Sequence, residues 1–357
     1  MNKAEQSDVI IGPEDPILIT GANGFIGSRV VENLVDRGFR ELVCLTRPSS
    51  DSAKLEALVG RRGTEARIRV IKGNLLSRKD CALAAKEAAA IFHLAAGGSD
   101  KSFPDAFMNT VVTTRNLVEA SLQSQSLKRF VNVSSFAVYT NMHKRKWGQL
   151  DESCPVETRA HLRGDAYCFA KVKQDEIVAE YGKRCRLPYV IVRPGYVYGP
   201  GKKSISSRVG INTFGIFLHL GGSNTMPFTY VDNCADAIVM AGLKRGVEGE
   251  IFNIVDDDLP SSRQFLRLHK RNAGRFKSVY IPHFASHLLC WIWEKCSDWS
   301  DGQLPPAFNR RRWHALWKRT RYSNEKLKTR VGWKPRTTTA DGLRRYFEGY
   351  RDGGSLA

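Results

Sequence analysis

The sequence has no continuous apolar run long enough to cross a bilayer, and its first residues, MNKAEQSDVIIGPEDP, lack the apolar core of a secretory signal peptide. None of its eight cysteines forms a CxxC pair, which argues against a zinc site or a disulfide framework. It also has no internal repeat and no low-complexity segment. We therefore expect a globular cytoplasmic protein with free thiols and no bound metal.

Acidic residues are too few to balance the basic ones: 36 Asp and Glu face 55 Lys and Arg, and the net charge is +19. The excess gathers late in the chain, between 310 and 330. Such a field would attract phosphates, nucleic acid or an anionic membrane surface. Because no zinc-finger, homeodomain or RNP pattern accompanies it, we expect no nucleic-acid binding and favour a solvated basic face.

A dinucleotide-binding turn stands near the start. Residues 16–20 form a short apolar run that predicts a buried strand, and residues 28–39 have the spacing of a helix. Glycines in the turn between them permit close backbone approach, and the helix start offers free N–H groups to a pyrophosphate. This pattern predicts cofactor contacts at Gly21, Asn23, Gly24, Phe25, Ile26 and Gly27.

The residue that follows the predicted strand at 42–46 indicates which cofactor binds, because an acidic residue there would bind the ribose of NAD. Arg47 stands there instead, which suits the 2′-phosphate of NADP; the alternative is that it stacks on adenine or faces water. We therefore expect NADP or NAD, with NADP favoured. Further contacts are expected after the strand at 68–73, at Asn74 and Leu75, and at the small-residue end of the strand at 90–96, at Leu94, Ala95 and Ala96.

The chain order predicts an α/β fold. Helices at 79–89, 104–123 and 165–180 alternate with strands at 129–135 and 189–193, which is typical of a doubly wound parallel sheet. We expect a flexible arm over 1–15, a nucleotide-binding domain over 16–200 to which a strand at 251–255 returns, and a smaller substrate-binding lobe made of 201–250 and 259–357. The substrate cleft should lie at the strand carboxyl ends.

Tyr167 and Lys171 lie four residues apart and would share one face of the predicted helix. A lysine ammonium beside a phenol stabilises the phenolate, which would lower the tyrosine pKa from about 10 toward working pH. Tyr167 is thus a candidate proton donor and acceptor. The alternative is a packed tyrosine beside a solvated lysine.

Many motifs in one order carry a resemblance: TGANGFIG, FHLAA, VSSFAVY, YCFAK, RPGYVYGPG, FTYVDNCADAI and FNIVDDD. Over roughly 16–350 the chain resembles the extended short-chain dehydrogenase/reductases, also named the NAD-dependent epimerase/dehydratase family, with 3β-hydroxysteroid dehydrogenase-like relatives. The resemblance implies a Rossmann domain that binds NAD or NADP and a C-terminal lobe that binds a small-molecule substrate. It also implies a homodimer formed through helix 104–123 and the Tyr167 helix.

The resemblance assigns roles to single residues. Tyr167 would be the acid/base at the reacting oxygen, and Lys171 would hold the nicotinamide ribose. Ser135 would orient the substrate oxygen, with Ser134 as the alternative. Further cofactor contacts are expected at Val133, Pro194, Gly195 and Val197. Hydride transfer itself would be chemistry of the cofactor.

Several positions depart from the family pattern. Phe136 and Ala137 stand where dehydratases carry an Asp-Glu pair, which argues against elimination of water. Met226 and Pro227 stand where sugar-nucleotide epimerases carry an arginine, and Asn109 is one residue out of step with the family's NVxGTxN helix. The late basic residues Lys318, Arg319 and Arg321 could replace the missing arginine.

Three functions remain open. The first is an epimerase or reductase that acts on a nucleotide-sugar. The second is a dehydrogenase or reductase of a 3β-hydroxysteroid or dihydroflavonol-like alcohol. The apolar segment 284–293 of the chain would line the substrate pocket of such an enzyme, pack in the core or make a peripheral membrane contact. The third is a non-catalytic NADP-binding protein, against which the intact Ser135, Tyr167 and Lys171 argue.

Overall fold

A central parallel sheet organises the molecule. The structure, a computed structural model, describes residues 8–50, 53, 55, 57, 66–98, 102–142, 148–213, 215–301, 303–305 and 308–351. The sheet has seven strands in the order β12-β7-β5-β4-β1-β2-β3, and all six pairings are parallel. Its strands are β1 (Ile17–Thr20), β2 (Glu41–Thr46), β3 (Arg67–Lys72), β4 (Ala90–His93), β5 (Arg129–Val133), β7 (Tyr189–Pro194) and β12 (Ile251–Ile254). The predicted doubly wound sheet is confirmed.

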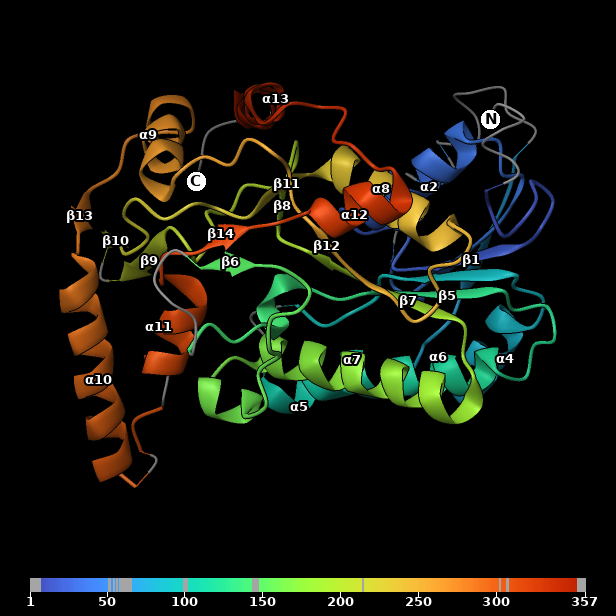
Figure 1. The fold of residues 1–357 in the computed structure, drawn as a ribbon, viewed down its shortest axis with the longest axis horizontal. Helices are drawn as coiled ribbons and strands as arrows, with labels where there is room; N and C mark the ends of the chain where they lie inside the picture. The colour runs from blue at the N-terminus through green and yellow to red at the C-terminus, as the bar shows by residue number, and fades with distance from the viewer. Residues whose placement is uncertain are drawn as a thin grey trace.

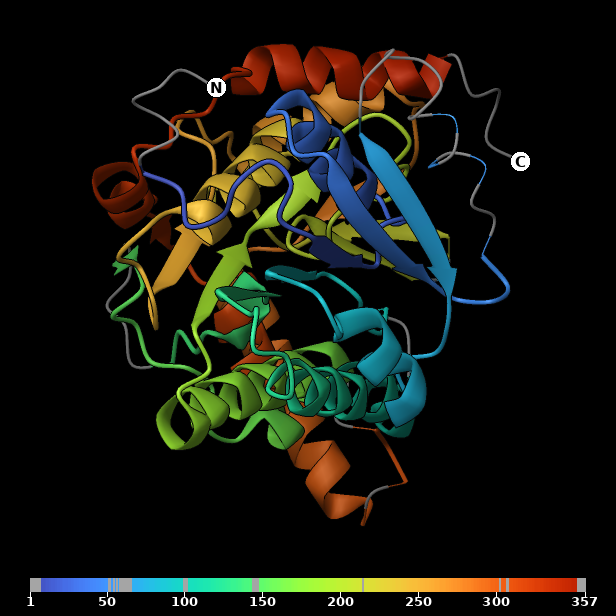
Figure 2. The same ribbon diagram turned by 90° about the vertical axis from the view of Figure 1, so that its right-hand side faces the viewer.

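Helices cover both faces of this sheet, as Figures 1 and 2 show. One layer holds α4 (Arg78–Ala85), α5 (Phe103–Ala106), the π-helix η1 (Phe107–Val112), α6 (Thr113–Ser121) and α7 (Ala166–Cys185). The other holds α2 (Gly27–Asp36), α8 (Val231–Leu243) and α12 (Glu325–Val331). Strands covered on both faces must be apolar throughout, and β1, β4 and β5 are buried at every residue.

The second lobe lies beyond the carboxyl ends of the strands (Figure 1). Its helices are α9 (Ser262–Asn272), α10 (His283–Trp299), α11 (Arg310–Leu316) and α13 (Thr339–Arg351). A small sheet joins β9 (Gly210–Thr213), β10 (Ile216–His219) and β13 (Ser278–Tyr280). Two strand pairs complete it: β8 (Tyr196–Tyr198) with β11 (Phe228–Tyr230), and β6 (Gln149–Leu150) with β14 (Arg321–Tyr322). Short 3₁₀ turns, η2 (Phe136–Val138) and η3 (Ala160–Arg163), precede α7.

The predicted arm differs from the structure in its second half. Residues 1–7 lie outside the described residues. Residues 8–15 are held against the end of α8, where the amide of Ile10 donates to the carbonyl of Leu243 over 3.0 Å. Ile11 is 3% exposed and belongs to the main core. Burial of this apolar side chain explains why the segment is not loose.

The late basic segment is also less solvated than expected. Five of its side chains form ion pairs with carboxylates from other elements, at 2.6 to 3.5 Å: Arg310 with Glu294, Arg311 with Glu157, Lys326 and Arg330 with Glu250, and Lys328 with Asp257. Part of the positive charge therefore serves packing within the chain.

Candidate active site

The glycine turn brings the chain unusually close to β4. Gly21 has φ +70°, and a Cβ atom there would lie 2.9 Å from the backbone nitrogen of Ala95. A Cβ on Gly27 would lie 2.0 Å from the carbonyl oxygen of Gly21. Side chains at these positions would therefore push β1, β4 and α2 apart. The turn also directs the start of α2 toward the carboxyl edge of the sheet, where its free N–H groups favour an anion.

A cleft of about 340 Å³ opens beside this turn, over the ends of β1, β2 and β4. Nine of the predicted cofactor residues line it: Gly21, Asn23, Gly24, Arg47, Asn74, Leu75, Leu94, Ala95 and Ala96. Its wall also includes residues that the sequence did not single out, namely Leu45, Thr46, Ser50, Gly73 and Thr113. The buried hydroxyl of Thr46 has no hydrogen-bond partner in the part of the chain that the structure describes. With this hydroxyl and the free N–H groups of the turn, the cleft offers donors that fit a dinucleotide.

Two predicted contacts in the cleft differ in availability. Arg47 is exposed at the rim, so its guanidinium is accessible to a ligand. The side-chain oxygen of Asn74 instead accepts a hydrogen bond from the amide of Leu76 at 3.0 Å. This local turn occupies one lone pair of that oxygen and leaves the side-chain nitrogen of Asn74 free to meet an adenine edge.

The π-helix η1 explains why Asn109 is out of step with the family pattern. A π-turn accommodates one extra residue within a helix, and the faces realign after it. Asn109 within η1 and Thr113, directly after it, consequently line the same cleft. Beyond the π-turn, the side-chain nitrogen of Asn116 donates to the carbonyls of Leu75 and Leu76, at 3.0 and 3.1 Å.

The remaining predicted cofactor residues lie outside the lining of that cleft. Phe25 and Ile26 belong to the turn before α2. Pro194 ends β7, and Gly195 approaches β11 so closely that a Cβ would lie 2.1 Å from the carbonyl oxygen of Pro227. The buried Val197 follows in β8. Val133 ends β5, and its carbonyl oxygen accepts a hydrogen bond from Lys171 at 2.7 Å.

The structure brings Ser135, Tyr167 and Lys171 together at the carboxyl edge of β5. Asp165 caps α7 by accepting from the amide of Cys168 at 3.0 Å, so Tyr167 lies in the first turn of the helix. The hydroxyl oxygen of Ser135 accepts from the amide of Ala137 at 3.1 Å, and the nearness of Ser135 to Tyr167 lowers the pKa of that phenol. The hydroxyl of Ser134 is buried and has no hydrogen-bond partner among the described residues. The effect of Ser135 on the Tyr167 pKa favours this serine over Ser134 as the neighbour of the tyrosine.

The electrostatics of the pair differ from the sequence expectation. Burial raises the pKa of Tyr167 above its ordinary value of 10.0, and the hydrogen bond with Ser135 opposes this only in part. Burial lowers the pKa of Lys171 to about 8, against the pull of Asp175. The Lys171 ammonium lies 6.0 Å from the centre of the Tyr167 ring. At this distance desolvation dominates, so the predicted lowering of the tyrosine pKa is wrong for this state of the protein.

A buried chain of polar side chains connects Lys171 to the glycine turn. The Lys171 ammonium donates to Oε1 of Gln174 at 2.8 Å, and Nε2 of Gln174 donates to Oγ1 of Thr114 at 2.9 Å. Nε2 of His93 lies 2.9 Å from the same Thr114 oxygen, and its Nδ1 lies 2.8 Å from Oγ1 of Thr20. His93 is completely buried, which lowers its pKa to about 3, and it is the satisfied core histidine that we expected.

A second buried network supports the same edge of the sheet. Nε and Nη2 of Arg193 donate to one carboxylate oxygen of Asp175 at 3.1 and 3.0 Å, and Asn132 donates to the other at 3.0 Å. The Arg193 guanidinium also lies 4.8 Å from the centre of the Tyr139 ring. The ion pair between Arg193 and Asp175 holds β7 against α7, the helix that carries Tyr167.

On the substrate side, aromatic and basic groups meet next to Ser135. Phe136 stacks on Tyr322 of β14, with ring centres 5.6 Å apart. Nη1 of Arg208 donates to the Tyr322 hydroxyl at 3.3 Å and to the carbonyl of Ala315 at 3.0 Å. Arg208 has no acidic partner among the ion pairs found in the described residues, and its burial lowers its pKa. No sequence pattern pointed to this arginine, because its neighbours in the chain are irregular.

The late basic residues occupy other positions. The Lys318 ammonium donates to the carbonyl of Asn141 at 2.5 Å, in the loop after η2. Arg321 is exposed at the start of β14.

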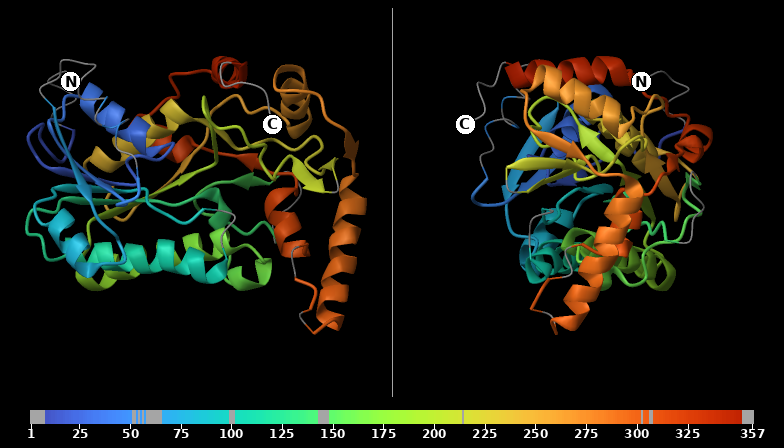
Figure 3. Two further views of the ribbon diagram at one scale, coloured as in Figure 1. Left: turned by 180° about the vertical axis from the view of Figure 1, so that it is seen from behind. Right: turned by 90° about the vertical axis from the view of Figure 1, so that its left-hand side faces the viewer.

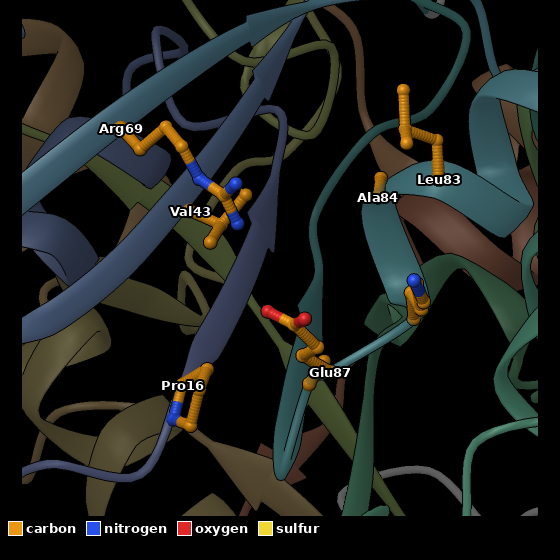
Figure 4. A pocket seen from close by; sticks show the side chains of 8 residues that line it. Pro16, Val43, Arg69, Leu83, Ala84 and Glu87 are labelled. Carbon is orange, nitrogen blue, oxygen red and sulfur yellow. The ribbon is translucent and has the colours of Figure 1, made fainter.

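A separate hollow of about 160 Å³ lies at the opposite edge of the sheet (Figure 4). Pro16, just before β1, and Ala88, just before β4, mark that amino edge. Ligands of open α/β sheets bind at the carboxyl edge, so this hollow is not part of the candidate site.

Comparison with known proteins identifies the family. The sequence profile described as "NAD dependent epimerase/dehydratase family" matches residues 17–255, which cover both networks and the catalytic candidates. The chain belongs to this family.

Similar proteins differ in the substrates that their names state. The trifunctional UDP-glucose 4,6-dehydratase/epimerase/reductase RHM3 of Arabidopsis thaliana is 28% identical over 67% of this chain and 36% of its own length. A 3β-hydroxysteroid-dehydrogenase/decarboxylase of the same plant is 24% identical over 93% of this chain and 61% of its own length. The crystal structure of a UDP-glucuronic acid 4-epimerase from Bacillus cereus with NAD superimposes with a TM-score of 0.69 at 21% identity, over 94% and 99% of the two chains. This last likeness confirms the fold.

The chain spans between 36% and 47% of the length of the three trifunctional relatives. At the positions where the family's dehydratases carry carboxylates, the structure has a buried Phe136 and Ala137, whose carbonyl accepts from Arg163 at 2.7 Å. Met226 is likewise buried, at 1% exposure, where the family's epimerases carry an arginine.

Proposed function

We propose that this protein transfers hydride between a nicotinamide cofactor and a hydroxyl or keto carbon of a nucleotide-sugar, as an epimerase or reductase and not as a 4,6-dehydratase. The observation that carries the proposal is that Ser135, Tyr167 and Lys171 lie together at the same sheet edge as the glycine cleft. Ser135 is near enough to Tyr167 to lower the pKa of its phenol, and the Lys171 ammonium lies 6.0 Å from the centre of the Tyr167 ring. A serine, a tyrosine and a lysine in this arrangement can bind and protonate a substrate oxygen.

Each side chain has a proposed role. Gly21, Gly24 and the start of α2 would hold the cofactor phosphates, and the cofactor would supply the hydride. Ser135 would donate a hydrogen bond to the substrate oxygen and orient it toward Tyr167. Because the pKa of Tyr167 is raised, its phenol carries a proton at neutral pH and can give that proton to a carbonyl oxygen. Lys171 would hold the cofactor ribose.

An anionic substrate is supported by Arg208. Its guanidinium is half-buried and directed to Tyr322, beside Ser135, and a diphosphate or carboxylate there would supply the acidic partner that it lacks among the described ion pairs. The names of relatives such as the trifunctional UDP-glucose enzyme and the UDP-glucuronic acid 4-epimerase agree with this class. The lack of carboxylates at Phe136 and Ala137 argues against water elimination.

A second candidate is oxidation or reduction of a 3β-hydroxysteroid or dihydroflavonol-like alcohol. The stacked rings of Phe136 and Tyr322 and the buried Met226 would suit an apolar substrate. The similar 3β-hydroxysteroid-dehydrogenase/decarboxylase supports this class. The two candidates share the same chemistry at Tyr167 and differ in what surrounds it.

We further propose NADP as the preferred cofactor, because the exposed Arg47 at the cleft rim can pair with a 2′-phosphate. A homodimer would form through α5, η1 and α7. Exposed apolar side chains support it. Phe103 (37%) and Phe107 (37%) lie beside Phe169 of α7, and Met108 (43%) follows Phe107 in η1. A cytoplasmic location is supported by eight free cysteines, six of them buried.

A ligand screen followed by one substitution tests the function. UDP- and dTDP-sugars should raise the melting temperature of the wild-type protein with NADPH, and sterols or flavonoids should not. With the substrate so identified, Tyr167→Phe should lower turnover by about 10²–10⁴-fold while cofactor affinity stays unchanged. Stabilisation by sterols alone would favour the second candidate, and full turnover by the variant would remove Tyr167 from its role.

A further inference from the structure

Helix α10 has an inverted distribution of side chains. The face that packs on the protein carries small or polar residues: Ser286, Cys290 and Ser297 are buried. Ser286 accepts a hydrogen bond at 2.9 Å from the indole of Trp313 in α11. The large apolar residues lie on the other side and are exposed to solvent. An amphipathic helix normally buries its apolar face, so this face lacks a cover within the described chain.

The exposed apolar residues recur at helical spacing. We name Phe284, Leu288, Trp291, Ile292 and Trp299 the α10 apolar face; their exposed fractions are 78%, 52%, 42%, 44% and 88%. Leu289, at 58%, widens it. Figure 1 shows α10 projecting past the helices of the second lobe, and Figure 3 shows its whole length along one end of the molecule. A projecting ridge with this composition suits a flat apolar medium.

The neighbouring strand β13 extends the ridge. Val279 is 50% exposed and Tyr280 is 44% exposed. The guanidinium of Arg263 in α9 lies 5.4 Å from the centre of the Tyr280 ring. Tryptophan and tyrosine, which carry an apolar ring and a polar atom, are the residues enriched where membrane meets water.

Within the described chain, unpaired positive charge lies on α9 and on the residues that lead into β13. From residue 259 to residue 293 the sequence has no Asp or Glu, and it has six Lys or Arg. Of these, the exposed ones are Arg263, Arg267, Arg271, Arg275 and Lys277. None of them takes part in an ion pair among the residues that the structure describes, in contrast to the paired cations of the segment after residue 309. A row of free cations next to apolar side chains complements an anionic lipid surface.

We propose that the protein docks on anionic membranes through the α10 apolar face, with the cations of α9 and of the residues just before β13 against the lipid headgroups. No helix among the described residues has the length and apolar character to span a bilayer. The helix therefore lies in the interface, with Ser286 and Cys290 still packed on the protein and the opposite side chains among the acyl chains. The proposal is independent of which reaction the protein catalyses.

Charge argues for lipid and against a second copy of the chain. A symmetric dimer brings the same patch of both subunits together. In such a dimer the unpaired arginines of α9 would meet few free carboxylates. The sequence has no Asp or Glu between residues 259 and 293, and Glu294 and Asp298 of α10 already pair with Arg310 and Lys295. Anionic headgroups supply the missing negative charge, and the dimer surface proposed above lies on α5 and α7 instead.

The ridge is linked to the catalytic candidates through α11. Nδ2 of Asn309, the residue that caps α11, donates to the carbonyl of Arg163 at 3.0 Å. Arg163 ends the η3 turn, and Tyr167 follows four residues later. A docked protein would thus hold its substrate side near the lipid surface.

Vesicle flotation with the full-length protein tests the proposal. Vesicles of phosphatidylcholine and phosphatidylglycerol in equal parts should carry the protein, and vesicles of phosphatidylcholine alone should carry on the order of tenfold less. High salt should weaken the binding. The triple variant Phe284→Ser, Leu288→Ser, Trp299→Ser should lose on the order of tenfold or more in vesicle affinity. Because these side chains are exposed in the wild type, the variant should keep its melting temperature.

Leu83→Ser is the matched control, since Leu83 is 65% exposed on α4 and remote from the ridge. It should float like the wild type. Failure of the wild type to bind anionic vesicles, or an equal loss in the control, would overturn the proposal. So would a dimer in solution that the triple variant converts to monomer while vesicle binding is absent, because the ridge would then be a contact between copies of the chain.

Discussion

Nε2 of His93 donates to Oγ1 of Thr114 over 2.9 Å, and this direction follows from the other bonds of that threonine. The single Thr114 hydroxyl hydrogen goes to the carbonyl of Thr110 at 2.5 Å, so its oxygen can only accept from His93 and Gln174. Nδ1 of His93 must then accept from Thr20, whose oxygen accepts in turn from the amide of Ala95. One neutral tautomer satisfies the whole chain from the cofactor cleft to Thr114.

Gln174 couples this hydrogen-bonded chain to Lys171. An apolar and an acidic substitution of Gln174 should therefore shift the pKa of Lys171 in opposite directions. Gln174→Leu removes an acceptor from the ammonium, so the pKa of Lys171 should fall below about 8. It should also destabilise the fold by about 1–3 kcal/mol, because Thr114 loses a donor. Gln174→Glu places a carboxylate beside the ammonium and should raise that pKa. NMR of labelled lysine side chains measures both, and equal titration in the two variants would rule out the coupling.

The buried lysine also predicts how stability depends on pH. The unfolded chain keeps the Lys171 proton up to a pKa of 10.5, whereas the folded chain releases it at about 8. Between these values the unfolded state binds more protons, so the free energy of unfolding should rise with pH, by up to about 3 kcal/mol. Lys171→Met lacks this titration. Urea denaturation of both proteins from about pH 7 to 10 should show the wild type gaining on the variant; parallel curves would contradict the lowered pKa.

Gly21→Ala should abolish tight cofactor binding. The new Cβ would meet the backbone of β4 at 2.9 Å, and φ +70° would be strained by any side chain. Gly38→Ala separates the two effects, because Gly38 has φ +87° but open space around it. It should lose about 1 kcal/mol of stability and keep its affinity. NADPH fluorescence titration distinguishes them, and equal affinities in both variants would show that the close approach to β4 is not needed.

Arg47→Ala should reduce NADPH affinity roughly tenfold or more, which is the effect of losing a charge-assisted hydrogen bond. NADH affinity should change little, because that cofactor has no 2′-phosphate for the guanidinium to meet. Titration of wild type and variant with both cofactors gives the four constants. If NADH binds the wild type as tightly as NADPH does, the NADP preference is wrong whatever the variant shows.

Local sequence patterns predicted the strands of the central sheet but not the buried hydrogen-bond networks beside it. Runs such as 17–20 and 90–93 are apolar at adjacent positions, so their burial could be expected without tertiary information. The Lys171–Gln174–Thr114–His93 chain joins three separate elements, and no local pattern records that meeting. The raised pKa of Tyr167 could not be predicted from the sequence for the same reason, because desolvation depends on every residue that packs around the ring.

Helix α10 shows a second limit. Its periodicity predicts a helix with an apolar stripe, but periodicity does not say which face another element will cover. The π-helix η1 shows the same limit. The sequence shows that Asn109 is one residue out of step with the family pattern. That a π-turn accommodates the extra residue follows from backbone hydrogen bonds, which only the structure gives.

The seventh strand of the sheet sets a condition on how the chain can be made. β12 pairs with β7 only after more than fifty residues, which include β8 to β11 and α8, have intervened, as the register of Phe252 beside Val192 shows. A ribosome that has released only residues up to 200 has therefore delivered a sheet with an open, apolar edge at β7. Fragments cut there should aggregate, and the nascent chain must wait for residues 251–254 before its first domain can close.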